Sequence, residues 1–272
     1  MSMTALFDAV RAVKGSALTQ ADVDLINAAL APIPANDTGG RIDPGRFAAW
    51  APKAIPHTLH ALQSAANDTG GRIDPGRFAA WAPKAIPHTL HALQSAANAH
   101  GFSGVVLAHW LGQMYVESAG FSVLSESLNY SVEGLLKTFG RHRITEAEAR
   151  KFGRTASQPA NQEALANILY GGVWGAANLG NTQPGDGWRF RGSGYKQITG
   201  RANTIASGFS PEELRSDPAK SAKAAAEFFI RAGCVTAAQK DSVEAVTRKV
   251  NGGVNGLDDR IIRTGQAKGV IL

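Results

Sequence analysis

Apolar residues recur three or four positions apart along most of the chain, which is the spacing of one helix face. Within 104–117, for example, Val106, Trp110 and Met114 share a face. Convincing alternation of apolar and polar residues, the pattern of a strand, is scarce. The pattern therefore predicts an all-α fold, with helices over 19–30, 104–117, 131–139, 144–152, 160–170, 218–232 and 241–250, another starting at Ser210-Pro211, and a last one from Asp258.

A perfect tandem repeat interrupts this pattern near the N-terminus. Residues 36–66 and 67–97 are identical, which indicates a recent duplication, natural or engineered, because the units of an old repeat diverge. Each copy predicts a turn followed by a helix that two prolines kink or interrupt, Pro52 and Pro56 in one and Pro83 and Pro87 in the other. Either copy can fill a single core site. The other then exposes an apolar stripe, and we expect it to promote self-association.

The repeat also duplicates a pair of histidines, His57/His60 and His88/His91, at a spacing that metal ligands use. No carboxylate or cysteine accompanies either pair, so we interpret the pairs as copied surface residues and expect no metal and no cofactor. Cys234 is the single cysteine, which excludes an internal disulfide and a cysteine-rich metal site.

Residues 171–200 are rich in glycine and carry four aromatic residues, Trp174, Trp188, Phe190 and Tyr195. The segment matches neither a phosphate-binding loop nor a dinucleotide-binding fingerprint. A long glycine-rich loop in a helical protein is usually functional or disordered, and the aromatic residues argue against disorder. Two readings remain: a loop of a sugar-binding cleft, in which rings such as Trp188 stack on pyranose faces, and a connector with no binding role.

Composition and charge narrow the class of partner. The chain has 272 residues, 44% of them hydrophobic and 18% charged, as in an ordinary globular protein. No apolar run is long enough to span a membrane, and Asp8 and Arg11 interrupt the stretch where a secretory signal would lie. A formal net charge of +6 favours polyanionic partners, namely nucleic acid, anionic lipid or an acidic cell-wall polymer.

Two glutamates form the strongest candidate for chemistry. Glu117 is expected to end the 104–117 helix on its apolar face, where burial and the negative helix end both favour a protonated carboxyl. Glu126 lies nine residues later in a hydroxyl-rich stretch, where it should stay ionised. A protonated and an ionised carboxyl together are typical of glycosidic bond hydrolysis. By spacing alone, however, two such glutamates are more often surface residues, and the local environments leave the two readings level.

A family resemblance decides between them. Glu117-Ser118-Ala119-Gly120-Phe121 followed by Glu126-Ser127-Leu128-Asn129-Tyr130 resembles phage endolysins of the glycoside hydrolase family 19 (chitinase-like) lysozyme group. The similarity covers about residues 101–260 and continues through Asn178-Leu179-Gly180-Asn181, Pro184-Gly185-Asp186-Gly187, Arg189-Phe190-Arg191-Gly192, Gln197-Ile198-Thr199-Gly200-Arg201-Ala202-Asn203 and Asn251-Gly252-Gly253-Val254-Asn255-Gly256-Leu257.

The resemblance implies a single lysozyme-like domain over 1–272, with two helical lobes around a substrate cleft. Residues 1–100 would be an N-terminal helical part and 101–272 the catalytic core. Glu117 would be the general acid, Glu126 the base that activates water, and Thr199 a residue that helps to hold that water. Substrate-binding residues would be Gln197, Asn251, Tyr130, Trp188 and Arg201.

The resemblance also implies an activity and a location. We expect an endolysin that hydrolyses β-1,4 bonds of peptidoglycan by an inverting mechanism, binds no nucleic acid and does not insert into a membrane. It would remain in the host cytoplasm until lysis and then reach the periplasm and wall. The alternatives are a chitinase acting on N-acetylglucosamine polymers and a non-catalytic wall-binding relative.

This sequence departs from the family pattern at two places near the glutamine. Ser193 stands where the family commonly has a second arginine, and Tyr195-Lys196 replace an apolar pair before Gln197. Thr204 also replaces a tyrosine that commonly follows Arg-Ala-Asn. The missing arginine raises the question of which cation, if any, supports the two glutamates.

Overall fold

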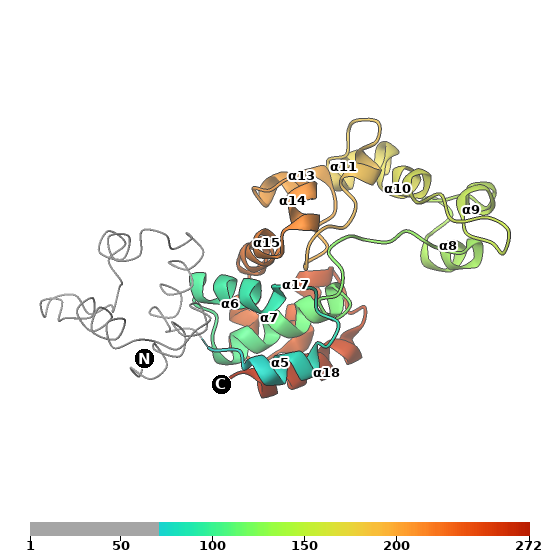
Figure 1. Cartoon of the computed structure of the whole chain (residues 1–272). Coiled ribbons are helices and arrows are strands. Elements are labelled where there is room, and N and C mark those ends of the chain that lie inside the picture. The colour runs from blue at the N-terminus through green and yellow to red at the C-terminus, as the bar shows by residue number, and fades with distance from the viewer. Residues whose placement is uncertain (1–70) are drawn as a thin grey trace, which may run out of the picture. The chain divides into compact units, whose positions relative to one another are not determined.

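A computed structural model describes residues 71–272, and within them the secondary structure is helical (Figure 1). Four isolated β-bridges occur in this part of the chain, and none extends into a strand. The all-α prediction is therefore confirmed for these residues. Ile73–Ala96 and Gly104–Leu272 form one compact unit, to which the following description refers. The predicted helix over 19–30 and the first repeat copy lie outside the described residues.

Fourteen helices follow one another in this part of the chain. They are α5 (Pro75–Trp81), α6 (Thr89–Ala99), α7 (Gly104–Glu117), α8 (Val132–Thr138), α9 (Glu146–Phe152), α10 (Gln162–Tyr170), α11 (Gly172–Leu179), α12 (Asp186–Arg189), α13 (Arg201–Ala206), α14 (Pro211–Ser216), α15 (Pro218–Arg231), α16 (Cys234–Gln239), α17 (Val243–Asn251) and α18 (Leu257–Val270).

The second repeat copy forms α5 and most of α6. Asp74 caps α5 by accepting a hydrogen bond from the Arg77 backbone N–H, and Pro75 occupies the first helical position. Pro83 and Pro87 lie between α5 and α6. Of the two predicted outcomes, a kink or an interruption, the prolines therefore interrupt the helix. Phe78 is buried, and its ring lies 5.7 Å from that of Phe121, which follows α7. The second copy therefore contributes to the core of this unit.

A first lobe is built on the packing of α7 against α18, with α5 and α17 packed on α18 as well. On the α7 face that the pattern predicts to be apolar, Trp110 and Met114 are buried and Val106 is half-buried, and Leu111 is buried as well. The close approach depends on Gly112, because a Cβ atom there would lie only 2.7 Å from the Thr264 Cα atom of α18. This packing fixes the C-terminal end of α7, which is Glu117.

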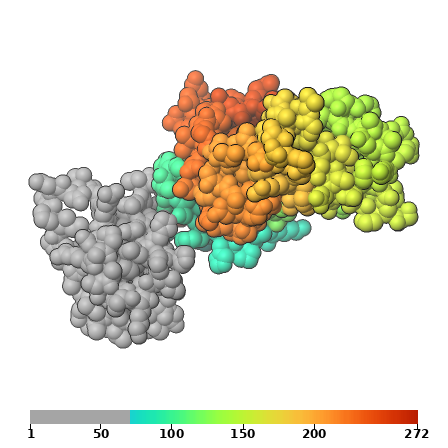
Figure 2. Space-filling model, turned by 90° about the horizontal axis from the view of Figure 1, so that it is seen from above, coloured from blue at the N-terminus to red at the C-terminus, as the bar shows by residue number. Residues whose placement is uncertain are grey.

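A second lobe has its own core, formed mainly by α8, α9 and α10, and α12 packs against α10. In Figure 1 this lobe lies away from α5, α7 and α18, and α11, α13 and α14 lie between α10 and α15. From above, the α10–α12 region lies between the α8–α9 and α13–α14 regions (Figure 2). The two predicted lobes are therefore present, whereas the substrate cleft stays a prediction. The core residues of the second lobe are Leu128, Leu135, Ile144, Ala149, Leu165, Ala166 and Leu169.

Some helices start where the sequence predicts them because a side chain caps them there, whereas α9, α10 and α17 begin two residues later than predicted. Ser131 caps α8, and Ser210 forms a capping box with Glu213 at the start of α14. The helix over 104–117 has the predicted bounds.

Residues 171–200 do not form the single long loop that the glycine content predicts. They contain α11 and α12, and α11 ends at Gly180 in the left-handed conformation. The sequence pattern did not predict α11 because Gly171, Gly172 and Gly175 lower the helix propensity of this segment. Tertiary packing overrides that low propensity. Helices α13 and α16, each of six residues, were also not predicted.

Within 71–272, no helix combines the length and the apolarity that crossing a membrane requires.

Candidate active site

One short segment, 191–196, contacts both candidate glutamates. The backbone of Glu126 pairs with that of Gly192, since the Glu126 N–H donates to the Gly192 carbonyl oxygen at 2.9 Å. The Gly192 N–H in turn donates to the Glu126 carboxylate at 2.9 Å, and Lys196 Nζ lies 3.6 Å from the Glu117 carboxylate. The sequence motif that carries these residues thus links the two lobes at the site.

Glu126 is held from two sides. The Tyr170 hydroxyl, at the end of α10, donates a hydrogen bond of 2.6 Å to Oε1, while Gly192 N–H holds Oε2. Burial, followed by the negative charge of Glu126, raises the pKa of Tyr170, so this hydroxyl stays protonated and remains a donor. Hydrogen bonds to both oxygens fix the plane of the carboxylate. Tyr170 and Gly192, and not the neighbouring serine hydroxyls that the sequence pointed to, are the hydrogen-bond partners of the Glu126 carboxylate.

Glu117 is the last residue of α7, and its side chain is 11% exposed, so the predicted burial is confirmed. Arg260 of α18 donates from Nη2 to Glu117 Oε1 at 2.6 Å and from Nη1 to the buried Gln113 at 2.5 Å. With Lys196 near Oε2, two positive charges flank the carboxylate. Sequence reasoning considered burial and the helix end but missed both cations. The signal for Lys196 was its unusual position before Gln197, whereas Arg260 gave none.

Gln197 and Thr199 lie on the same segment. Gln197 adopts a left-handed backbone conformation (φ 54°), and its side-chain amide donates to the Gly194 carbonyl at 2.9 Å. Gln197 Oε1 and the Glu126 side chain both lie so close to Gly192 that a methyl group on the Gly192 Cα atom would collide with them. The Thr199 hydroxyl donates to the Gln197 carbonyl at 3.2 Å and keeps its lone pairs as acceptors.

The remaining candidates take different positions. Tyr130 is half-buried, and burial, followed by the negative charge of Glu126, raises its pKa. Trp188 packs on the core of the second lobe and stacks on the Arg191 guanidinium. Asn251 is exposed at the end of α17. Arg201 instead directs its guanidinium to Asp186, with hydrogen bonds of 2.9 and 2.5 Å.

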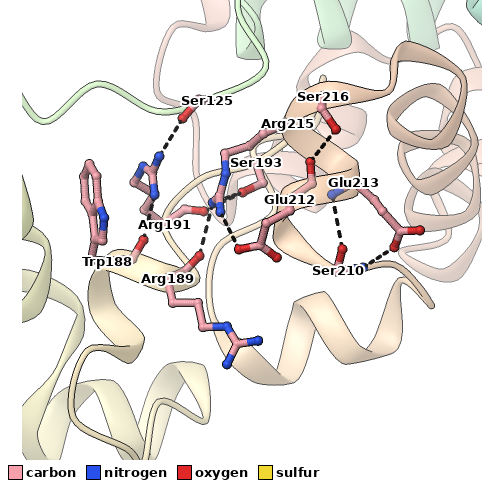
Figure 3. A network of polar contacts seen from close by, with 10 residues as sticks. All are labelled: Ser125, Trp188, Arg189, Arg191, Ser193, Ser210, Glu212, Glu213, Arg215 and Ser216. Atoms are coloured by element: carbon pink, nitrogen blue, oxygen red, sulfur yellow. Dashed lines mark hydrogen bonds and ion pairs between the residues drawn. The ribbon is translucent and has the colours of Figure 1, made fainter.

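Ser193, the departure from the family pattern, is buried and contacts neither glutamate through its side chain. Its hydroxyl donates to the Arg191 carbonyl at 2.8 Å and accepts from Arg215 Nη1 at 3.0 Å (Figure 3). Arg215 of α14 therefore brings a guanidinium group next to Ser193, at the position where the family commonly has an arginine. The cations that support Glu117 are Arg260 and Lys196, which answers the question that the sequence left open.

The Asp186–Arg201 ion pair gives a prediction for acid stability. Burial raises the pKa of Asp186, but the Arg201 hydrogen bonds and the Gln183 backbone N–H outweigh it, so the pKa lies below its ordinary value. A carboxyl with a lowered folded-state pKa adds stability above its unfolded pKa and loses it as pH falls through the folded one. The free energy of unfolding should therefore fall between about pH 5 and pH 2, and less steeply in Asp186→Asn. Urea titrations at several pH values measure this slope; an equal slope in both proteins would contradict the prediction.

Among residues 71–272, no three His, Cys, Asp or Glu side chains gather in a way that could hold a metal ion. His88 and His91 of the second copy are both exposed. The His57/His60 pair lies outside the described part of the chain.

Comparisons with known proteins bear on this arrangement. No family model matches the chain. A protein of Haemophilus influenzae described as "Glycosyl hydrolase family 19 domain-containing protein" is 37% identical over 161 residues, which cover 56% of this chain and 74% of that protein. The crystal structure of chitinase C from Streptomyces griseus HUT6037 aligns with a TM-score of 0.42 and 14% identity, over 73% of this chain and 76% of that one.

Proposed function

This chain belongs to glycosyl hydrolase family 19, and from that premise we propose that it hydrolyses β-1,4 glycosidic bonds of bacterial peptidoglycan by general acid–base catalysis. The observation that carries the proposal is the pair of glutamates. Glu117 is buried between two cations at a helix end, while Glu126 is fixed by a tyrosine and a backbone N–H. Two carboxyls in such different surroundings can take different roles on the same bond.

Glu117 is the proposed general acid. Arg260 donates to Oε1, so that oxygen must keep an acceptor lone pair, and the transferable proton belongs on Oε2. Arg260 and Lys196 both lie against this carboxyl group. After the proton has passed to the leaving glycosidic oxygen, the same two cations stabilise the carboxylate that remains.

Glu126 is the proposed base. Tyr170 and Gly192 each occupy one lone pair of its carboxylate, which leaves other lone pairs to accept a proton from the attacking water. The Thr199 hydroxyl can accept a hydrogen bond from that water. For an inverting reaction, the two carboxyl groups should stand about 6.5–9.5 Å apart so that water fits between base and sugar. Gln197, Asn251, Tyr130 and Trp188 are the proposed sugar-binding residues.

The net charge of +6 supports an anionic wall polymer as substrate rather than neutral chitin. We propose a phage or prophage endolysin, held in the host cytoplasm until lysis. The test is product analysis. Outer-membrane-stripped Gram-negative cells should lose turbidity, and a muramidase should leave N-acetylmuramic acid at the new reducing end. A product ending only in N-acetylglucosamine would indicate a glucosaminidase or chitinase, and absence of any released sugar would indicate a binding protein.

Removing the Tyr170 hydroxyl should weaken catalysis with little effect on substrate binding. The hydroxyl orients Glu126 but is not placed against the sugar, so Tyr170→Phe should lower kcat about tenfold and leave KM within about twofold. Tyr115→Phe is a matched control, because its hydroxyl makes only a 3.4 Å contact to the Trp81 carbonyl. Steady-state rates on purified glycan measure both; equal kcat in the two variants would contradict the positioning role.

A methyl group at position 192 should disturb the same carboxylate from the other side. An alanine Cβ there would lie 2.7 Å from Gln197 Oε1, 3.0 Å from Glu126 Cβ and 3.2 Å from Glu126 Oε2. The side chains on both sides must move, so Gly192→Ala should lower kcat/KM by about tenfold or more while the helical circular dichroism spectrum is retained. Full activity in this variant would show that Glu126 tolerates displacement.

A further inference from the structure

Arg191 and Arg215 lie near the segment that holds Glu126, with Arg189 next to them in the chain, and the proposed mechanism uses none of the three. Arg189 and Arg191 flank the end of α12, and Arg215 comes from α14 (Figure 3). We refer to Arg189, Arg191 and Arg215 as the arginine cluster. Arg215 is tied down, since Nη1 donates to Ser193 Oγ and the Arg189 carbonyl, and Nη2 pairs with Glu212 at 3.2 Å.

Arg191 is fixed in place but lacks a carboxylate partner. Its guanidinium stacks 3.6 Å from the Trp188 ring, Nη1 donates to the Trp188 carbonyl at 3.0 Å, and Nη2 donates to Ser125 Oγ at 3.2 Å. Its Nε is buried with no hydrogen-bond partner. Of the ion pairs within 71–272, none includes Arg191, although Arg201, Arg215 and Arg260 each have one.

The remaining donors of Arg191 form a prepared anion site. A guanidinium has five N–H donors; two of them are used here and the Nε–H is buried, which leaves one N–H on each of Nη1 and Nη2 for a ligand. The ring and the two neutral acceptors hold the group in one orientation, so binding an anion costs little further side-chain entropy. Planar, forked donors suit a carboxylate better than a neutral sugar hydroxyl.

The local charges also favour an anion at this place. Burial lowers the pKa of Arg191, while attraction to Glu126 and Glu212 opposes that shift. Burial and then the positive charge of Arg191 lower the pKa of Arg215. The two guanidinium groups therefore repel each other, and the nearby Glu212 side chain is 63% exposed, where water screens its charge. A bound carboxylate would relieve this repulsion.

Arg191 also lies beside the residues that hold the proposed base. Its hydrogen-bond partner Ser125 precedes Glu126 in sequence, and the next residue, Gly192, holds the Glu126 carboxylate. Ser125 and Gly192 both lie next to the proposed base, so an anion bound by Arg191 would also lie close to Glu126. Such an anion would therefore be part of the polymer on which the two glutamates act.

We propose that Arg191, with Arg215 beside it, binds a carboxylate of the glycan and so makes this site select an anionic, muramic-acid-containing chain over a neutral one. This inference rests on the proposed function and names the chemical group that separates its two substrate classes. The carboxylate can come from the lactyl group of the sugar or from an attached peptide.

Binding to the Glu117→Gln variant tests the inference without turnover. Calorimetry would compare glycan strands stripped of peptide, the same strands with lactyl carboxylates methyl-esterified, strands that carry peptides, and chitooligosaccharides. We expect free carboxylate to be preferred over ester by about tenfold or more, and Glu117→Gln/Arg191→Gln to reduce that preference to about twofold or less. Arg191→Lys keeps the charge but not the fork and should retain part of the preference.

Arg189→Gln is the matched control in the same background. Arg189 lies two residues before Arg191 and its side chain is exposed. Its replacement removes an equal charge, and the preference for free carboxylate should persist. A preference only for the stripped strands identifies the lactyl group, and one only for peptide-bearing strands identifies the peptide; either supports the site. The proposed site would be overturned if the free-carboxylate strands, the methyl-esterified strands and the peptide-bearing strands all bound equally well. An unchanged preference in Arg191→Gln would also overturn it. Because the preference is a ratio, a general loss of folding does not imitate the result. Product analysis, by contrast, decides the proposed function separately.

Discussion

Glu117→Gln is expected to reduce glycan hydrolysis by about 10²- to 10⁴-fold, the contribution of a general acid in a transition state. Glutamine has the shape of glutamate and can still accept the Arg260 hydrogen bond through its amide oxygen, so the packing of α7 on α18 should survive. The lost property is the transferable proton. Turbidity loss of outer-membrane-stripped cells, together with release of reducing ends, measures the effect.

A control separates this loss from a general effect of charge. Glu133 is exposed in the first turn of α8, and Glu133→Gln changes the net charge by the same amount away from the site. This variant should lyse cells at about the rate of the unmodified protein. Undiminished lysis by Glu117→Gln would remove Glu117 from the mechanism, whatever the substrate proves to be.

Gly112→Ala is expected to destabilise the protein by about 1–3 kcal/mol, since it overpacks the contact of α7 with α18. The new Cβ would lie 2.5 Å from Thr264 Oγ1, 2.7 Å from Thr264 Cα and 2.8 Å from Thr264 N. Two of these atoms are backbone, so rotating a side chain does not relieve the clash and the helices must separate. For a chain of this size, each kcal/mol corresponds to about 2–4 °C in melting temperature.

The same substitution at Gly265, also in α18, is the matched control. A Cβ there meets no atom within 4 Å, and alanine favours the helix over glycine, so Gly265→Ala should leave stability equal or slightly higher. Thr264→Ala removes Oγ1, together with the Cγ2 methyl group, but neither backbone contact, and should rescue Gly112→Ala in part. Calorimetric melting of the four proteins measures these differences. A melting temperature of Gly112→Ala equal to that of Gly265→Ala would contradict the close-packing argument.

Activity should fall together with stability in Gly112→Ala. Arg260 lies on α18 and holds Glu117 at the end of α7, so a separation of the two helices lengthens that 2.6 Å contact. The loss should appear even well below the melting temperature, because it follows from geometry and not from unfolding.

Local sequence was sufficient for the features that neighbouring residues decide. The α7 helix has its predicted bounds because a continuous apolar face specifies it, and α8 and α14 start where Ser131 and Ser210 cap them. The helical pattern also predicted that Glu117 is largely buried. The sequence motifs pointed to a glycosyl hydrolase. Its glycine-rich segment, by contrast, predicted a loop where α11 and α12 form, because packing outweighs a weak propensity.

The sequence by itself determined the helical class of residues 71–272 and the starts of helices such as α8 and α14, because these depend on residues within about one or two helical turns, and its family motifs singled out the two carboxylates. Only the tertiary structure decided how those carboxylates are held. Arg260 reaches Glu117 across 143 positions, and Tyr170 reaches Glu126 across 44. Such partners are set by how two packed surfaces meet, and periodicity in one segment carries no information about which distant side chain will face it.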